Sequence, residues 1–265
     1  MSSDRREKLQ IVFALDADSS CVDGEGGGKF ADIAHVRALT PAHVLQLVVA
    51  IMEQSGFPME FKENGEEGAI DAGTYLKRVE SSGRWSIPLE ARGVSFRFGC
   101  VSNLKQSFLS VEEVRAGSIA CWEDWVVPFF NEKSFVQAWV ADVEYEYWQN
   151  AKDPLQYEAA GRPHDELPKR SNGLPPPLEQ VEIDISRNPG RCVLRSGYVE
   201  SIGTPMWLSP IFWRYVGKER RAPLLAAGWL EPLESGIDRI VLPMQSFCDG
   251  SAGGTQFKLR SALYG

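Results

Sequence analysis

The sequence lacks any run of about 20 apolar residues, the length that a helix needs to cross a membrane. Its N-terminus resembles a lipoprotein signal only superficially, because Asp16 and Asp18 interrupt the approach to Cys21. The segment Gln10–Leu15 is instead predicted to be a strand. We therefore expect a cytoplasmic protein that has no membrane partner.

Cysteine and histidine are too few and too scattered for the common metal sites. The five cysteines, at positions 21, 100, 121, 192 and 248, are far apart and form no CxxC pair. Such spacing indicates reduced thiols rather than a disulfide framework or a zinc cluster. The histidines His35, His43 and His164 form no HExxH or HxxxH pair.

Motifs for catalysis and for cofactor binding are incomplete. The glycine-rich loop 23–30 departs from a P-loop at Asp23, which replaces a glycine, and at Phe30, which replaces the hydroxyl. The acidic stretch 16–25 lacks the glycine and the glutamate that a calcium-binding loop requires. Ser251 lies in DGSAGG, which departs from the GxSxG pattern of hydrolases. We expect no cofactor, no metal and no catalytic residues, and hence a protein that is not an enzyme.

A basic surface is also missing, because 36 acidic residues exceed 28 basic ones and leave a net charge of −8. Nucleic acid is therefore not expected as a partner, since phosphates are bound by concentrated basic faces. An acidic protein is better suited to a basic protein partner. Solubility alone explains a charge of this size equally well.

Strand-like and helix-like segments alternate without a regular β-α-β rhythm. Helices are predicted at 40–55, 71–80, 110–116, 131–150, 209–215 and 219–227. Strands are predicted at 10–15, 94–100, 181–185, 191–200 and 237–242. This mix predicts an α+β fold, with a mixed or largely antiparallel sheet and helices packed on one side.

The domain organisation has two possible forms, because 265 residues is near the size at which one core stops growing. The segment 152–178 contains six of the sixteen prolines and little apolar periodicity, which is typical of a linker or a long surface loop. The chain is therefore expected to be a single α+β domain of residues 1–265, or two lobes, 1–151 and 179–265, joined by this loop.

The segment 131–150, NEKSFVQAWVADVEYEYWQN, combines helical spacing with acidic and aromatic side chains. A buried stripe is predicted at every fourth residue, namely Phe135, Trp139, Val143 and Tyr147. Outside that stripe lie the predicted partner-binding residues, namely Asp142, Glu144, Tyr145, Glu146 and Trp148. The alternative is a second aromatic face that packs beneath a neighbouring element.

The C-terminal part is rich in aromatic residues, most of which are expected in the core. The segments MWLSPIFWRYVG, LLAAGWLEPL and IDRIVL together resemble the immunity protein 52 family of bacterial polymorphic-toxin immunity proteins, over roughly residues 195–263. The resemblance implies a non-enzymatic cytoplasmic protein that binds and occludes one cognate secreted toxin. The family is associated with restriction-endonuclease-like toxins and type VI secretion, so a nuclease with a basic surface is the expected partner.

Two other functions stay open at the level of sequence. One is a hydrolase or transferase whose site is assembled from distant residues, for which Cys100, Cys121, His35 and His43 are the available groups. The other is a secretion adaptor or chaperone, which would stabilise its partner without inhibiting it.

Overall fold

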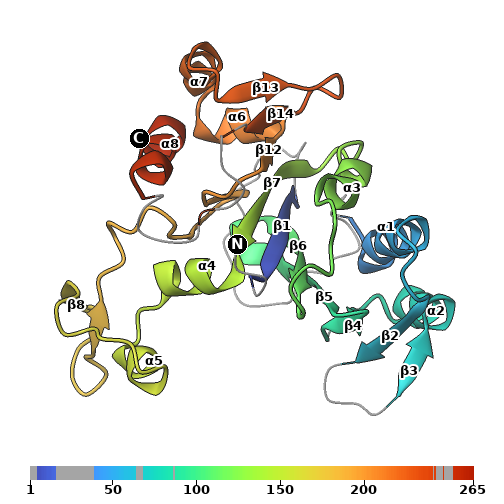
Figure 1. Cartoon of the computed structure of the whole chain (residues 1–265), viewed down its shortest axis with the longest axis horizontal. Coiled ribbons are helices and arrows are strands. Elements are labelled where there is room, and N and C mark those ends of the chain that lie inside the picture. The colour runs from blue at the N-terminus through green and yellow to red at the C-terminus, as the bar shows by residue number, and fades with distance from the viewer. Residues whose placement is uncertain are drawn as a thin grey trace, which may run out of the picture.

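The computed structural model describes residues 5–15, 39–63, 68–85, 87–240, 242, 247 and 253–265. Its centre is a ten-stranded sheet (Figure 1). In spatial order the strands are β13 (Leu230–Pro232), β14 (Asp238–Ile240), β12 (Met206–Leu208), β7 (Phe135–Asp142), β1 (Glu7–Ala14), β6 (Gln106–Glu113), β5 (Val94–Val101), β4 (Leu89–Ala91), β2 (Glu60–Glu63) and β3 (Ala69–Asp71). Every described pairing is antiparallel, which confirms the predicted α+β class with a largely antiparallel sheet.

Two hydrophobic clusters cover the two faces of the central strands. Alternate residues of β1 divide between them, with Ile11 in the first cluster and Val12 in the second. The first cluster includes residues of α1 (Pro41–Gln54), α2 (Ala72–Ser82), α3 (Glu123–Val126) and the 3₁₀ helix η3 (Val127–Phe129). The second includes residues of α6 (Pro210–Val216), α7 (Arg221–Ala226) and α8 (Gly253–Tyr264). Helices therefore cover both faces near β1, β7 and β12, not one side throughout as predicted.

Away from this centre, β5 and β6 have only one fully buried face. Phe96 of β5 is buried against the first cluster, whereas the next residue, Arg97, is exposed. In this half of the sheet the described helices α1 and α2 pack on the buried face, as predicted.

The helices α1 and α2 begin where their sequences predict. The Thr40 hydroxyl accepts a hydrogen bond from the amide of His43 at 3.1 Å, and Pro41 occupies the first turn. Asp71 caps α2 in the same way, accepting from the Thr74 amide at 2.9 Å. Gly83, with φ of 65°, ends α2 in the left-handed conformation that glycine favours.

The helix predicted over 131–150 is wrong for its first half. Residues Phe135–Asp142 form β7, and only α4 (Val143–Asn150) is helical. All eight residues of β7 are buried, because it lies between β1 and β12 with both faces covered. An apolar segment buried on both faces does not alternate, so its periodicity does not distinguish a strand from a helix.

Three further predictions need correction. Residues 110–116, predicted as a helix, belong in part to β6, which pairs with both β1 and β5. Residues 191–200, predicted as one strand, form a hairpin of β10 (Val193–Arg195) and β11 (Tyr198–Glu200) that turns at Gly197. The predicted helix 219–227 is divided into η4 (Lys218–Arg220) and α7.

The proline-rich segment is structured rather than a loop. It contains α5 (Pro154–Ala159) and β8 (Lys169–Ser171), and β8 pairs with β9 (Val181–Ile183). A small core of Ala151, Tyr157, Ile183 and Ile185 holds these elements together. We call residues 151–187 the outer module, which stands apart from the sheet at the end of α4 (Figure 1).

The main sheet contains strands from both sides of the outer module. The strand β7 precedes the module in sequence and pairs with β12, which follows it. In the part of the chain that the structure describes, no helix is long and apolar enough to span a membrane.

Candidate partner-binding site

The helix α4 connects the sheet to the outer module and carries the predicted partner-binding residues (Figure 1). It begins directly after β7, where the Asp142 carboxylate accepts a hydrogen bond from the Tyr145 amide at 2.7 Å. It ends at Ala151, the first residue of the small core of the outer module. Because the sheet holds one end of α4 and the core of the outer module holds the other, the direction of each side chain on α4 is fixed.

Two of the predicted contact residues face inward. Asp142 and Glu146 are only 5% and 8% exposed. Besides capping α4, Asp142 lies 3.8 Å from the guanidinium of Arg5. Both were predicted as partner contacts, which requires exposed carboxylates. Their burial is a correction, because they face the basic side chains of Arg5 and Lys8 at the start of the chain.

Glu146 is the centre of a buried polar cluster. It accepts a hydrogen bond from the indole of Trp139 at 3.2 Å and forms an ion pair with Lys8. Burial lowers the pKa of Lys8, but the nearby Glu146 carboxylate more than offsets this and raises the pKa above its ordinary value. Burial, and then the charge of Glu146, raises the pKa of the adjacent Cys192 thiol to about 12. Cys192 is therefore a neutral thiol rather than a nucleophile.

Tyr145 is also directed toward the body of the protein. Its hydroxyl donates a hydrogen bond to the side chain of Gln256 in α8 at 2.7 Å, and its ring packs against the second cluster. This residue joins α4 to α8, a role that fits the alternative in which part of the aromatic surface is buried.

Glu144 and Tyr147 face outward, whereas Trp148 packs against the small core of the outer module. We call these three residues, with Arg162 of the outer module, the outward face of α4. Glu144 and Tyr147 are exposed, and Trp148 is half-buried. The rings of Tyr147 and Trp148 meet edge to face with centroids 4.9 Å apart. The prediction that Tyr147 lies in the buried stripe is wrong, because none of the described elements covers its ring.

Arg162 of the outer module completes this face. Its guanidinium lies 4.4 Å from the centre of the Trp148 ring and donates to Glu144 at 2.7 Å. Tyr157 lies against Trp148 with ring centroids 4.8 Å apart. Sequence reasoning did not identify Arg162, because no local pattern connects an arginine of the proline-rich segment with a tryptophan on α4.

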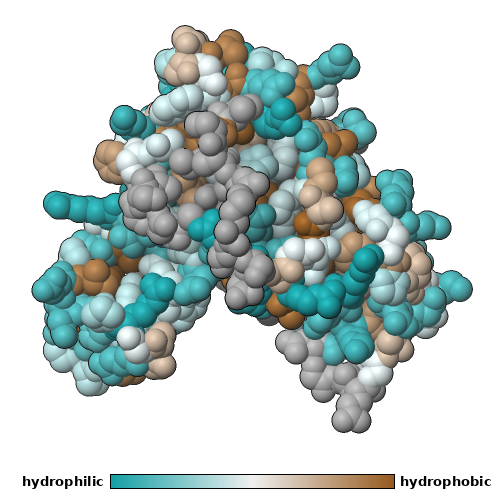
Figure 2. All heavy atoms as spheres, viewed as in Figure 1, coloured by the Kyte–Doolittle hydropathy of each residue, from teal (hydrophilic) through white to brown (hydrophobic). Residues whose placement is uncertain are grey.

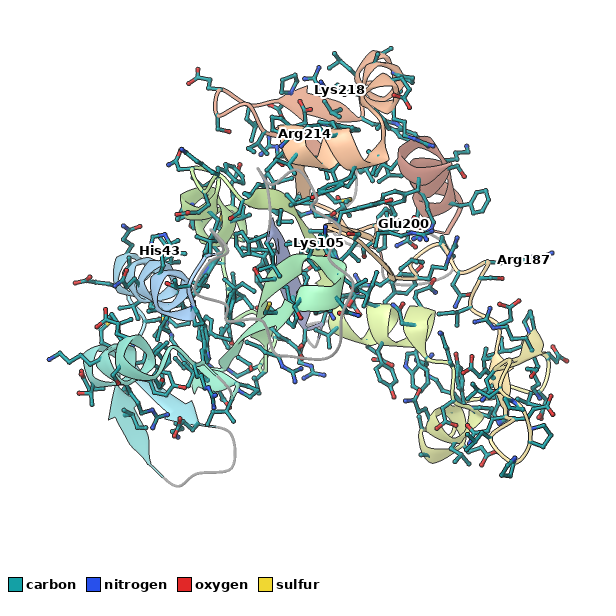
Figure 3. All side chains as sticks on the ribbon, turned by 180° about the vertical axis from the view of Figure 1, so that it is seen from behind. His43, Lys105, Arg187, Glu200, Arg214 and Lys218 are labelled. Atoms are coloured by element: carbon teal, nitrogen blue, oxygen red, sulfur yellow. The ribbon has the colours of Figure 1, made fainter. Side chains whose placement is uncertain are left out.

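A pocket of about 320 Å³ lies between α4 and the outer module. Its walls include Trp148, Tyr157, Arg162, Pro163, Pro168 and Asp184. Figure 2 shows the outer module separated from the rest of the molecule by a notch. In Figure 3, seen from behind, Arg187 marks the segment by which the chain returns from the module to the body.

The segment that contains this site is acidic. From Asp142 to Arg187 there are ten acidic and five basic residues. With Asp142 and Glu146 directed inward, eight acidic residues still exceed the five basic ones. The outward charge of this part of the chain is therefore negative.

A second cavity, of about 590 Å³, lies between the end of α1 and residues 117–128. It is lined by Cys121, Asp124 and Ser118, among others, and no described histidine lines it. His43 instead lies at the start of α1, 2.8 Å from the carboxylate of Glu132. Cys100 is exposed on β5, where partial burial raises the pKa of its thiol.

Several candidate groups from the sequence lie outside the described residues. They are Cys21, His35, Cys248, Ser251, the glycine-rich loop 23–30 and the acidic stretch 16–25. Among the residues that are described, no group of three or more His, Cys, Asp or Glu side chains has the arrangement of a metal site.

Comparison of the chain with protein-family models, with curated proteins and with solved structures finds no match. The function is therefore inferred from the geometry of the site itself.

Proposed function

We propose that this protein is an immunity protein that binds and occludes a secreted bacterial toxin, a nuclease in particular, without catalysis of its own. The toxin contacts the outward face of α4 and the adjoining outer module. A nuclease that binds phosphates presents a basic surface, so an acidic protein can cover that surface and exclude the substrate.

The observation that carries this proposal is the position of Arg162. An arginine guanidinium already lies on the Trp148 ring and against the Glu144 carboxylate. The outward face of α4 is thus chemically suited to a guanidinium group, the group that a basic nuclease surface offers most often. The exposed ring of Tyr147 adds the kind of aromatic contact area that dominates many interfaces.

The negative charge of the segment supports the same interpretation. Apart from Asp142 and Glu146, eight acidic residues exceed the five basic ones between positions 142 and 187, and this net negative charge attracts a basic protein before contact. Steering of this kind raises the association rate and is weakened by salt.

Co-expression with the toxin encoded beside this gene tests the proposal. We expect restored growth of the host cells and co-purification of the two proteins. A complex that forms without restoring growth would instead indicate a secretion adaptor or chaperone. No complex and no restored growth would refute the immunity function.

The variant Glu144→Lys separates this site from the rest of the acidic surface. Glu144 is exposed, and its reversal repels a basic partner and releases Arg162, so association is expected to slow. Glu53→Lys on α1 is a matched reversal, since Glu53 is exposed and lies outside the proposed contact region. Equal effects of the two reversals would place the contact elsewhere.

A hydrolase or transferase is the second candidate, and the cavity that contains Cys121 favours it. This cavity is lined by the thiol of Cys121, the hydroxyl of Ser118 and the carboxylate of Asp124. Cys121→Ala distinguishes the two functions, because it would abolish such an activity but leave toxin neutralisation unchanged.

A further inference from the structure

The pocket between α4 and the outer module combines aromatic walls with a carboxylate. Trp148 and Tyr157 supply two rings in van der Waals contact, and Pro163 and Pro168 extend the apolar surface. Its volume of about 320 Å³ is at the small end of ligand pockets. A pocket of this volume can hold a single long side chain but not a large ligand.

Asp184 is the carboxylate that lines this pocket. One of its oxygens accepts a hydrogen bond from the Ser186 amide at 2.9 Å, and this bond lowers the pKa of the carboxyl group. Arg170 forms a long ion pair with Asp184 at 3.9 Å, which is beyond hydrogen-bonding distance, and the charges of Arg170 and Arg187 also lower the pKa of this carboxyl group. The carboxylate is therefore charged and retains capacity to accept further hydrogen bonds.

The positive charge of Arg162 is already matched. Its guanidinium donates to Glu144 at 2.7 Å and lies over the Trp148 ring, 4.4 Å from the ring centroid. A second cation in the pocket would meet the Arg162–Glu144 ion pair on one wall and the Asp184 carboxylate on another. The Asp184 carboxylate would then compensate the charge of that cation.

We propose that this pocket receives a lysine or arginine side chain of the partner protein. The aliphatic stem lies along the rings of Trp148 and Tyr157, and the charged head binds the Asp184 carboxylate. The identity of the partner follows from the proposed function, but the preference of the pocket for a cationic side chain is a property of this chain alone.

Other side chains fit the pocket less well. An acidic side chain would face Asp184 and be repelled. An uncharged apolar side chain would remove water from Asp184 without offering a hydrogen bond, which disfavours its entry. The three kinds of side chain are therefore distinguishable by binding.

Short peptides are the direct test. The full-length, ¹⁵N-labelled protein is titrated with acetyl-Gly-Arg-Gly-amide, and with the same peptide carrying Glu or Leu in place of Arg. We expect saturable NMR shifts of the Trp148 indole signal, assigned from Trp148→Phe, with the Arg peptide only. Absence of saturable binding, or equal binding of the Leu or Glu peptide, would overturn the proposal.

Three variants sharpen the test. Asp184→Asn keeps an oxygen for the Ser186 amide but removes the charge, and is expected to weaken Arg-peptide binding about threefold. Asp165→Asn removes an exposed charge of the same module outside the pocket walls and is expected to leave binding unchanged. Arg162→Gln removes a competing cation and frees Glu144, so it is expected to strengthen binding. Weakening by Arg162→Gln would contradict the proposal, because it would indicate an anionic ligand.

The two proposals fail separately. Selective binding of the Arg peptide without any toxin complex would retain the pocket and refute the immunity function. A toxin complex that is unaffected by Asp184→Asn, together with no selectivity among the peptides, would retain the immunity function and refute the pocket.

Discussion

The aromatic residues Tyr147 and Trp148 are neighbours in sequence but have different structural roles. Tyr147 is 48% exposed, whereas the ring of Trp148 contacts Tyr157 and Arg162 of the outer module. We expect Trp148→Ala to destabilise the outer module by about 2 kcal/mol, less than for a fully buried tryptophan. Hydrogen exchange measures this loss: in the variant, we expect the amides of residues 151–187 to gain more in exchange rate than those of the sheet.

Tyr147→Ala is the matched comparison. Because that ring is exposed, we expect little change in hydrogen exchange but faster dissociation of the partner. Equal loss of protection in both variants would show that Tyr147 is also structural.

The ion pair of Lys8 and Glu146 predicts a dependence of stability on pH. Since the pKa of Lys8 is raised in the folded protein, the pair stabilises the fold fully below the ordinary value of 10.5. This stability is lost as the pH rises through the higher folded value. We expect the wild-type melting temperature to fall in this alkaline range more steeply than that of Lys8→Met.

Glu146→Gln is expected to lower the free energy of unfolding at neutral pH by about 2 kcal/mol, because the largely buried Lys8 loses its ion-pair partner and keeps only the attraction of Glu112. Urea denaturation measures the difference. The exposed Glu144→Gln is the control on the same helix, and a similar loss there would contradict the structural role of Glu146.

Among the elements, α1 and α2 were predictable because their boundaries are encoded locally. Thr40-Pro41 and Asp71 provide caps, and Gly83 provides the left-handed end. The strand β7 was not predictable, since burial of both faces removes the alternation that marks a strand.

The candidate site was predictable only in part for the same kind of reason. The composition of 142–148 drew attention to α4, but the choice between inward and outward carboxylates depends on β1 and Lys8, which are distant in sequence. Arg162 and Asp184 reach the site through the fold of the outer module, which has no local signature in a proline-rich segment.

The start of α4 gives a prediction for an element boundary. Asp142→Ala removes the acceptor for the Tyr145 amide and is expected to cost about 1 kcal/mol of stability. Asp142→Asn keeps an acceptor oxygen and is expected to retain most of it. Thermal melts compare the two, and equal losses would show that the charge near Arg5, rather than the cap, is what stabilises this end.

At the scale of the whole molecule, the outer module and the sheet have separate cores. The core of the module contains Ala151, Tyr157, Ile183 and Ile185, none of which belongs to the two clusters on the sheet. The two ends of the module lie close together, because the Asn188 side chain donates to the Gln149 carbonyl at 3.0 Å. The chain therefore leaves the body and returns to it at nearly the same place.

Replacement of residues 152–186 by a short glycine-serine linker is consequently expected to leave the sheet folded. We expect the shortened protein to keep a cooperative thermal transition and the far-ultraviolet circular dichroism of the sheet, since its strands pair outside the deleted segment. It is expected to lose toxin binding, because it lacks Arg162, Tyr157 and Asp184. A folded variant that still neutralises the toxin would locate the contact on the sheet or its helices instead. An unfolded variant would show that the module stabilises the body through α4. Single substitution of the half-buried Trp148, which packs against the core of the module, would then test this contact first.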